Sequence, residues 1–192
     1  MEFDRIKTML LKWWPVLALF LIFLFCYYIR AMNNMPDRIL SFDPVFMYRQ
    51  TYYIANWGHL PVWDELSYYP GRPMDYDYAA PFMFYLTTLL WWLLKGFGLS
   101  LLTTASYAGA LYGAAITIPA FLLGRELSNK WGGLMAATLA GTAPQILIRT
   151  FGASYDTDQL VLFFLLLTIF AGLYAFRKKT PASFCLILGS FA

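Results

Sequence analysis

Two aspartates, Asp156 and Asp158, stand one residue apart in the segment GASYDTD (152–158), which separates two long apolar stretches. Charge that faces lipid is costly, so acidic residues placed between apolar stretches indicate a functional site. Carboxylate oxygens are the ligands that Mg²⁺ and Mn²⁺ prefer, and a D-x-D pair on a short turn can bind one ion. The pair alone is therefore a candidate divalent metal site, in which the metal would act as a Lewis acid on a phosphate-linked substrate, and the residues around it decide between this role and helix capping.

A third carboxylate, Asp43, precedes Pro44. This pairing is typical of a helix start, with Asp as the N-cap and Pro at the first helical position. Three neighbouring carboxylates repel one another unless a cation lies between them. We expect Asp43, Asp156 and Asp158 to converge on one ion at the external membrane surface, as catalytic and metal-binding residues. The alternative, which the residues leave open, is that Asp156 caps a helix beginning near Gln159 and Asp158 lies near its positive end.

Other polar residues give weaker indications. Asp75 and Asp77 form a second D-x-D pair, which we interpret as a solvated loop turn, with contact to a substrate head group as the alternative. His59 is the only histidine and has no Cys or His partner at zinc-binding spacing, so we interpret it as a loop residue. Cys26 and Cys185 lie in apolar stretches, a setting typical of buried thiols.

The composition places the chain in a membrane. Hydrophobic residues make up 60% of it and charged residues only 13%, more apolar character than a soluble domain hides in one core. The net charge is +3, and the basic residues stand in short groups between apolar stretches. Basic residues grouped in this way indicate how the chain is oriented in a membrane, and they do not indicate nucleic-acid binding. We expect an all-α polytopic membrane protein.

Length divides the apolar stretches into spans and one interfacial helix. About 20 apolar residues are needed to cross a bilayer, and the stretch that starts at Pro81 is too short. Basic residues mark the cytoplasmic side. The predicted transmembrane helices are 13–29, 99–124, 131–149 and 159–176, with the start of a truncated one at 181–192. On the cytoplasmic side we place the amino terminus (1–12) and the turns at 125–130 and 177–180. On the external side we place a first loop (30–98), which contains an interfacial helix at about 81–95, and a second loop (150–158).

Three local features refine this picture. The first external loop is rich in proline and aromatic residues, so we expect it to be ordered and functional. Pro119 and Pro144 lie inside predicted spans and should kink them. Gly109 and Gly113 form a GxxxG pattern, which we interpret as close helix packing.

Four motifs in order, SFDP (41–44), YPGR (69–72), REL (125–127) and GASYDTD (152–158), together resemble the catalytic subunit of the asparagine-linked oligosaccharyltransferases. The short external loop makes the chain look more archaeal or bacterial than eukaryotic. The resemblance implies a transmembrane domain of the GT-C glycosyltransferase type with a large first external loop. It also implies an inverting transfer of a glycan from a polyprenyl-phosphate or polyprenyl-diphosphate carrier to Asn in an N-x-S/T sequon.

The resemblance further implies roles for single residues. Asp43 would bind the metal and contact the acceptor amide, while Asp156 and Asp158 would hold Mg²⁺ or Mn²⁺. The implied partners are a lipid-linked oligosaccharide, an acceptor polypeptide and membrane lipids, and the implied location is the cell membrane with the site facing outside, or the ER lumen in a eukaryote. Candidate substrate-binding residues are Arg49, Arg72, Asp75, Asp77 and Tyr155.

The family's sequon-reading motif lies beyond residue 192, so we expect this chain alone to be inactive. Two other functions stay open on the residues. One is a lipid-linked-sugar-dependent enzyme of the O-mannosyltransferase kind, and the other is an ion-coupled transporter that uses membrane aspartates.

Overall fold

A computed structural model describes residues 2–32, 34–35, 38–66, 70–73 and 81–179. Within these ranges the regular secondary structure is helical apart from one small hairpin, which confirms the predicted all-α class. The elements are α1 (Glu2–Ala31), α2 (Phe42–Trp57), β1 (Trp63–Asp64), β2 (Arg72–Pro73), α3 (Pro81–Leu94), η2 (Lys95–Phe97), α4 (Leu101–Ala115), α5 (Thr117–Leu127), α6 (Lys130–Thr142), α7 (Pro144–Thr150) and α8 (Asp158–Lys178).

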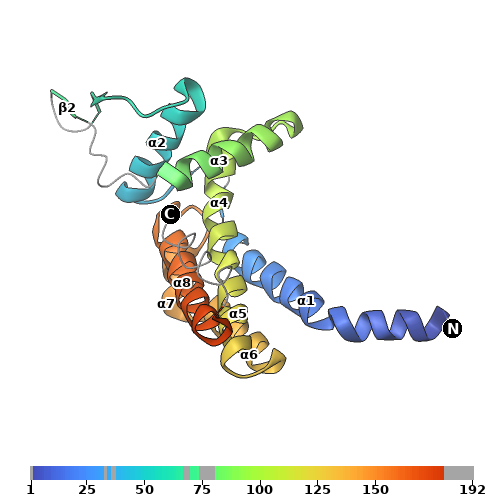
Figure 1. Ribbon diagram of the computed structural model, residues 1–192. Helices are drawn as coiled ribbons and strands as arrows, with labels where there is room; N and C mark the ends of the chain where they lie inside the picture. Colours follow the sequence, from blue (N-terminus) through green and yellow to red (C-terminus); the bar gives the residue numbers. More distant parts are fainter. Residues whose placement is uncertain (1, 33, 36–37, 67–69, 74–80, 180–192) are drawn as a thin grey trace.

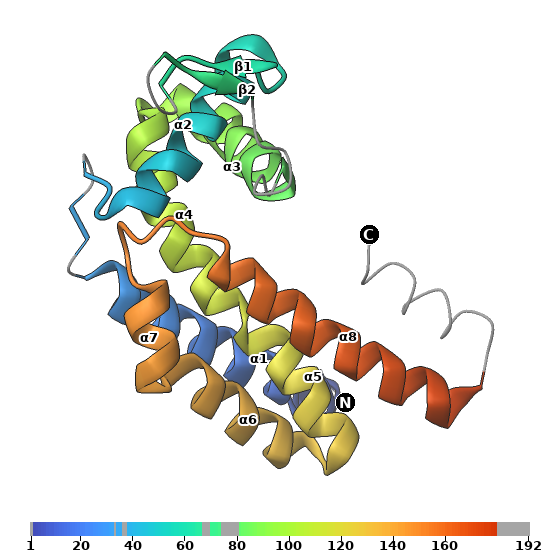
Figure 2. The same ribbon diagram turned by 90° about the vertical axis from the view of Figure 1, so that its left-hand side faces the viewer.

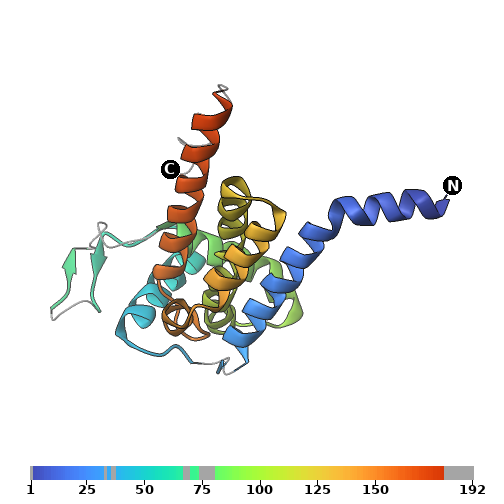
Figure 3. The ribbon, with the colours of Figure 1, turned by 90° about the horizontal axis from the view of Figure 1, so that it is seen from below.

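Three helical stretches among the described residues are long and apolar enough to cross a membrane: Trp13–Ala31 of α1, Leu101–Leu127 across α4 and α5, and Asp158–Lys178 of α8. The middle stretch is mostly buried, because α5 packs on α6 and α8 while α1 packs on α4 and α6. Side chains of Trp13–Ala31 in α1 and of α8 are largely exposed and apolar, as expected of surfaces that face lipid. The amino-terminal end of α1 extends away from the other helices (Figures 1 and 3).

The segment 131–149, expected as one span, consists of two helices. Helix α6 ends at Thr142 and α7 begins at Pro144. Proline has no backbone N–H and disfavours helical geometry in the residue before it. Ala143 accordingly takes φ −55° and ψ 124°, and the helix breaks there. A milder interruption at Ile116 divides the span 99–124 into α4 and α5.

Helix α3 begins and ends close to the predicted bounds of 81 and 95. It lies across the amino-terminal part of α4 and not alongside it (Figures 1 and 2), and it also packs on α2. Its location in the membrane interface stays a prediction, and this crossing orientation is the one such a location requires.

A small hairpin follows α2. Strands β1 and β2 pair antiparallel, with Trp63 opposite Pro73 and Asp64 opposite Arg72. The Asp64 side chain is buried and accepts hydrogen bonds from the Tyr53 hydroxyl at 3.2 Å and the Leu66 amide at 3.1 Å. This carboxylate therefore fastens the hairpin to α2.

Candidate functional site

The two segments that carry the predicted acidic residues meet directly. The Leu40 amide, just before α2, donates a hydrogen bond of 3.2 Å to the Ala153 carbonyl, in the loop between α7 and α8. Figures 2 and 3 show α2 and this loop at the same end of the helical bundle. A backbone hydrogen bond cannot cross a membrane, so Asp43 and Asp156 face the same side.

The aspartates of the D-x-D pair have different surroundings. Asp156 is partly buried and its Oδ1 accepts a hydrogen bond of 2.7 Å from the Thr157 amide. Asp158 lies in the first turn of α8, where the positive end of the helix favours its charge, and its Oδ2 is 3.7 Å from the Arg149 guanidinium. The N-cap of α8 is Thr157. The alternative in which Asp156 caps this helix is therefore wrong.

Asp43 is exposed in the first turn of α2. The prediction that it is the N-cap is wrong, because the helix begins at Phe42 with Ser41 in the capping position. Ser41 has a φ of 81° and makes no side-chain capping bond. The Asp43 carboxylate is thus left facing solvent instead of its own backbone.

The three carboxylates do not converge as expected. Among the described residues, no group of three or more His, Cys, Asp or Glu side chains lies close enough to hold a metal ion. Asp158 is turned toward Arg149, and Asp156 is turned toward the Thr157 amide. Their chemistry still fits a divalent cation, since all three offer hard oxygen donors that are at least partly accessible. Their metal-binding role stays a prediction.

Backbone strain occurs on both sides of the junction between the two loops. Ser41 has φ 81° and Ala153 has φ 66°, values that residues other than glycine rarely adopt. Such conformations cost about 1–3 kcal/mol each and collect at functional sites. The sequence gives no sign of this strain, because neither residue is a Gly or Asn.

Tyr155 is an internal anchor and not a ligand-facing residue. Its side chain is fully buried, and its hydroxyl lies 2.8 Å from Thr51 Oγ1 of α2 and donates to Thr87 Oγ1 of α3 at 2.8 Å. Burial raises the pKa of the Tyr155 hydroxyl, with a smaller contribution from nearby Tyr112. The predicted substrate contact of Tyr155 is corrected accordingly, since a buried side chain cannot reach a ligand.

Of the four other predicted substrate-binding residues, the structure describes two, Arg49 and Arg72. Arg49 donates to Asp64 Oδ2 at 2.5 Å and to the Leu66 carbonyl at 3.1 Å, so its guanidinium holds the hairpin. Arg72 lies in β2 and is partly buried. Asp75 and Asp77 lie outside the described residues. Among the described residues of this set, Arg72 therefore remains the candidate for substrate contact.

Glycine allows the acidic loop to pack closely on α4. A Cβ placed on Gly109 would lie 2.7 Å from the Ser154 carbonyl oxygen, and one on Gly113 would lie 2.7 Å from Arg30 Nε. Both distances are shorter than real Cβ contacts allow. These contacts confirm that the GxxxG pattern allows close packing. The acidic loop packs against Gly109 and the Arg30 side chain packs against Gly113.

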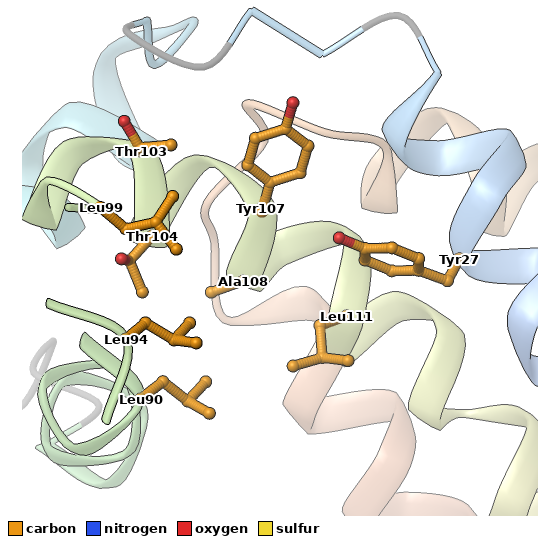
Figure 4. Close-up of a pocket in the computed structure, with 9 residues that line it drawn as sticks. All are labelled: Tyr27, Leu90, Leu94, Leu99, Thr103, Thr104, Tyr107, Ala108 and Leu111. Atoms are coloured by element: carbon orange, nitrogen blue, oxygen red, sulfur yellow. The ribbon is translucent and has the colours of Figure 1, made fainter. Parts of the chain in front are cut away.

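An apolar cavity of about 270 Å³ lies apart from these acidic residues, among α1, α3 and the start of α4 (Figure 4). The aromatic rings of Tyr27 and Tyr107 border it (Figure 4), and the rest of its lining is mainly leucine and threonine. None of the candidate catalytic residues lines it. Its lining therefore suits a hydrocarbon group and not a charged reaction centre.

Comparison with known proteins identifies related chains. A family model described as "Oligosaccharyl transferase STT3, N-terminal" matches residues 27–192. The chain is 29% identical over 162 residues to the dolichyl-diphosphooligosaccharide–protein glycosyltransferase subunit STT3B of Oryza sativa subsp. japonica, covering 81% of this chain and 22% of that relative. The chain thus spans about a fifth of that relative's length.

Solved structures of an archaeal oligosaccharyltransferase from Archaeoglobus fulgidus share the fold. The complex of this enzyme, AglB, with an inhibitory peptide and a dolichol-phosphate aligns with TM-score 0.74 and 23% identity, over 91% of this chain and 21% of that chain. The complex with Zn and sulfate gives TM-score 0.75 at 22% identity, over 90% and 23% of the two chains. The form tethered to an acceptor peptide with the NVT sequon gives TM-score 0.72 at 22% identity, over 92% and 22%.

Proposed function

Because the chain belongs to the oligosaccharyl transferase STT3 family, we propose that it provides part of the active site of a glycosyltransferase. The reaction moves a glycan from a polyprenyl-phosphate or polyprenyl-diphosphate carrier to the side-chain amide of Asn in an N-x-S/T sequon. Its relatives support this assignment, since the archaeal neighbour has been solved in complex with a dolichol-phosphate and tethered to an acceptor peptide that contains a sequon. The chain is the amino-terminal region of such a catalytic subunit, an integral membrane protein.

The observation that carries the proposal is the hydrogen bond between Leu40 and Ala153. It brings the start of α2, with Asp43, to the loop that bears Asp156 and Asp158. An acceptor amide held at Asp43 and a carrier phosphate held near the D-x-D pair would then lie on one side of the membrane. Such an arrangement brings both substrates of a transfer reaction together.

A divalent metal would be held by Asp43, Asp156 and Asp158. The complex of the archaeal neighbour with Zn and sulfate supports this proposal, and the donor oxygens here suit Mg²⁺ or Mn²⁺. When bound, the ion would supply Lewis-acid stabilisation of the negative charge on the leaving phosphate. The chain's own contribution is to fix the two acid-bearing segments against each other and to keep Asp43 exposed at the start of α2.

We propose that this site faces the outside of the cell, or the ER lumen in a eukaryote. The carrier and the acceptor polypeptide would approach it from that side, with membrane lipids surrounding α1 and α8. No observation in the structure favours an O-mannosyltransferase or a transporter. Comparison of Asn with Ser or Thr acceptors in one assay separates the first of these from the proposed reaction.

The test is glycan transfer by the whole protein to a sequon peptide with Mn²⁺ or Mg²⁺ present. Asp43→Ala, Asp156→Ala and Asp158→Ala should each lower the rate by about 100-fold or more, because each removes charge placed for the transition state. Chelation with EDTA should abolish transfer, and added Mn²⁺ should restore it. Glu65→Ala is the matched control, since Glu65 is an exposed acid of the same external loop.

The purified 192-residue chain, assayed in parallel, should form no glycopeptide, because it covers about a fifth of its relatives' length. Full activity in all three aspartate variants would contradict the proposed site. A glycopeptide made by the 192-residue chain would contradict the expectation that this segment is inactive by itself.

A further inference from the structure

We propose that Arg30 is a positioning residue that fixes the acidic loop from inside the helical bundle. Arg30 lies at the end of α1 and is only 1% exposed. It reaches no candidate catalytic group itself, so it would act through the backbone that carries Asp156 and Asp158. The inference rests on the proposed function of that loop and adds a residue to which neither the sequence nor the comparisons assign a role.

The Arg30 side chain joins three helices. Its Nε donates to Thr150 Oγ1 of α7 at 2.9 Å, and its Nη1 donates to the carbonyls of Gly141 in α6 and Cys26 in α1, each at 2.9 Å. A planar guanidinium presents these donors in a fixed geometry, which makes it suited to holding several groups in place at once. Helix α7, which leads directly into the acidic loop, is therefore tied to α1 and α6 at its last residue.

The Arg30 backbone holds the loop at a second point. Its carbonyl accepts a hydrogen bond of 2.8 Å from the Gly152 amide. The side chain and the main chain of one residue thus bind on both sides of Phe151, at Thr150 and at Gly152. The next residue, Ala153, donates to the Ser106 carbonyl and accepts from Leu40. A displacement of Gly152 would therefore loosen the junction between the two acid-bearing segments.

Glycines make room for this arrangement. A Cβ on Gly113 would lie 2.7 Å from Arg30 Nε, and a Cβ on Gly152 would lie 2.9 Å from the Arg30 carbonyl oxygen. A Cβ on Gly141 would collide with the sulfur of Cys26, whose carbonyl Arg30 also binds. The chain thus has no side chain at three positions around one buried arginine.

Stability alone does not account for a charge at this position. Within the described part of the chain, Arg30 Nη2 has no hydrogen-bond partner. Burying an incompletely paired charge is unfavourable, and apolar residues of similar volume often stabilise a protein more. The feature that an apolar residue could not supply is the set of directed bonds to Thr150, Gly141 and Cys26.

The first test uses hydrogen exchange of the metal-free whole protein in lipid nanodiscs. Arg30→Met keeps an unbranched side chain that reaches as far as the position of Nε, and it removes all the donors. Exchange at the amides of Gly152 and Ala153 should become at least tenfold faster, with exchange in α4 and α5 unchanged. Arg125→Met is the matched control, because Arg125 is an exposed arginine at the end of another span and should not alter the loop.

The second test uses transfer kinetics. Arg30→Met should lower kcat by about 10- to 100-fold, as expected when reacting groups are misplaced, and should leave KM for the acceptor peptide nearly unchanged. Arg30→Lys should recover only part of kcat, because an ammonium lacks the planar fork. Uniformly faster exchange across α1, α4 and α6, with normal kcat per folded molecule, would overturn the proposal in favour of a purely structural role.

A milder variant tests the same link if Arg30→Met does not fold. Thr150→Val removes the oxygen that accepts from Arg30 Nε and keeps the shape of the side chain. It should raise exchange at Gly152 in the same direction. Thr138→Val is its control, since Thr150 and Thr138 both bond the carbonyl four residues earlier and only Thr150 contacts Arg30.

The two proposals fail in distinguishable ways. Unchanged exchange at residues 150–156 in both Arg30→Met and Thr150→Val would overturn the role of Arg30 whatever the protein's activity. Absence of transfer in the wild-type protein would instead contradict the proposed function, and the exchange experiment would still decide the role of Arg30.

Discussion

The hydroxyl of Tyr155 links the acidic loop to two helices that precede it by many residues. It contacts Thr51 in α2 and Thr87 in α3, and the Tyr112 hydroxyl lies 2.8 Å from the same Thr87 oxygen. The residue next to Asp156 is therefore fixed against elements from three parts of the chain. Hydrogen bonds between neutral groups in a buried setting like this one hold geometry as much as they add stability.

Replacing Tyr155 by Phe should lower the free energy of unfolding by about 1–2 kcal/mol, because the threonine oxygens lose a buried partner. Thermal unfolding of the detergent-solubilised protein measures this change. Tyr52→Phe is the matched control, because Tyr52 is an exposed tyrosine of α2, next to Thr51 in the sequence. An equal loss in both variants would show that the Tyr155 hydroxyl makes no special contribution.

The same hydroxyl gives the protein a pH dependence at high pH. Burial raises the pKa of Tyr155 above that of an exposed tyrosine, about 10. A group with a raised folded-state pKa gives its full stabilisation below its unfolded pKa, and loses it as the pH rises further. Stability should therefore fall above about pH 10, and the fall should be smaller in Tyr155→Phe. Unfolding curves between pH 8 and 11 measure it, and identical slopes in the two proteins would contradict the assignment.

At the scale of elements, the close approach of the acidic loop to α4 depends on glycine. A methyl group at Gly109 would require Ser154 to move, and Ser154 is two residues from Asp156. The helix and the loop cannot both keep their positions if position 109 carries a side chain. The loop conformation is thus set partly by a residue that contributes no functional group.

Gly109→Ala should destabilise the protein by about 1–3 kcal/mol, the usual cost of overpacking a tight contact. It should also reduce glycan transfer by the folded protein, because the loop must shift. Gly172→Ala is the control, since nothing lies within 4 Å of its Cβ position in α8. That change should be neutral or stabilising by up to about 1 kcal/mol. Denaturation curves of both variants decide between these outcomes, and a neutral Gly109→Ala would contradict the packing argument.

Elements with strong local signals were predictable from the sequence, and the contacts between them were not. The apolar stretch from Pro81 and the break at Pro144 both follow from neighbouring residues. The burial of Arg30 does not, because it depends on Thr150, which lies 120 residues further along the chain. Read locally, Arg30 is a charge at the end of a span. The positive φ of Ser41 and Ala153 is likewise imposed by the junction between the loops, and the residue types at these two positions do not predict it.

At the scale of the whole molecule, the orientation of the chain can be tested by chemical labelling. Single cysteines at Phe42 and Phe151, both exposed, should react with a membrane-impermeant maleimide applied to intact cells when Cys26 and Cys185 have been replaced. A cysteine at the exposed Ser128, between α5 and α6, should react only after the membrane is permeabilised. Labelling of positions 42 and 151 from opposite sides would mean that α3 crosses the membrane.

The buried Arg30 also bears on how the protein is assembled during synthesis. Helix α1 is made before α6 and α7, and two of the three groups that its guanidinium binds, in Gly141 and Thr150, follow 111 and 120 residues later. A lone arginine in a membrane helix is unfavourable by about 2.5–3.5 kcal/mol at the bilayer centre, and near a helix end it extends toward water instead. The newly made α1 must therefore keep Arg30 at the aqueous surface until α6 and α7 are inserted. Closure of this end of the bundle, and with it formation of the acidic loop, is consequently a late event in biogenesis.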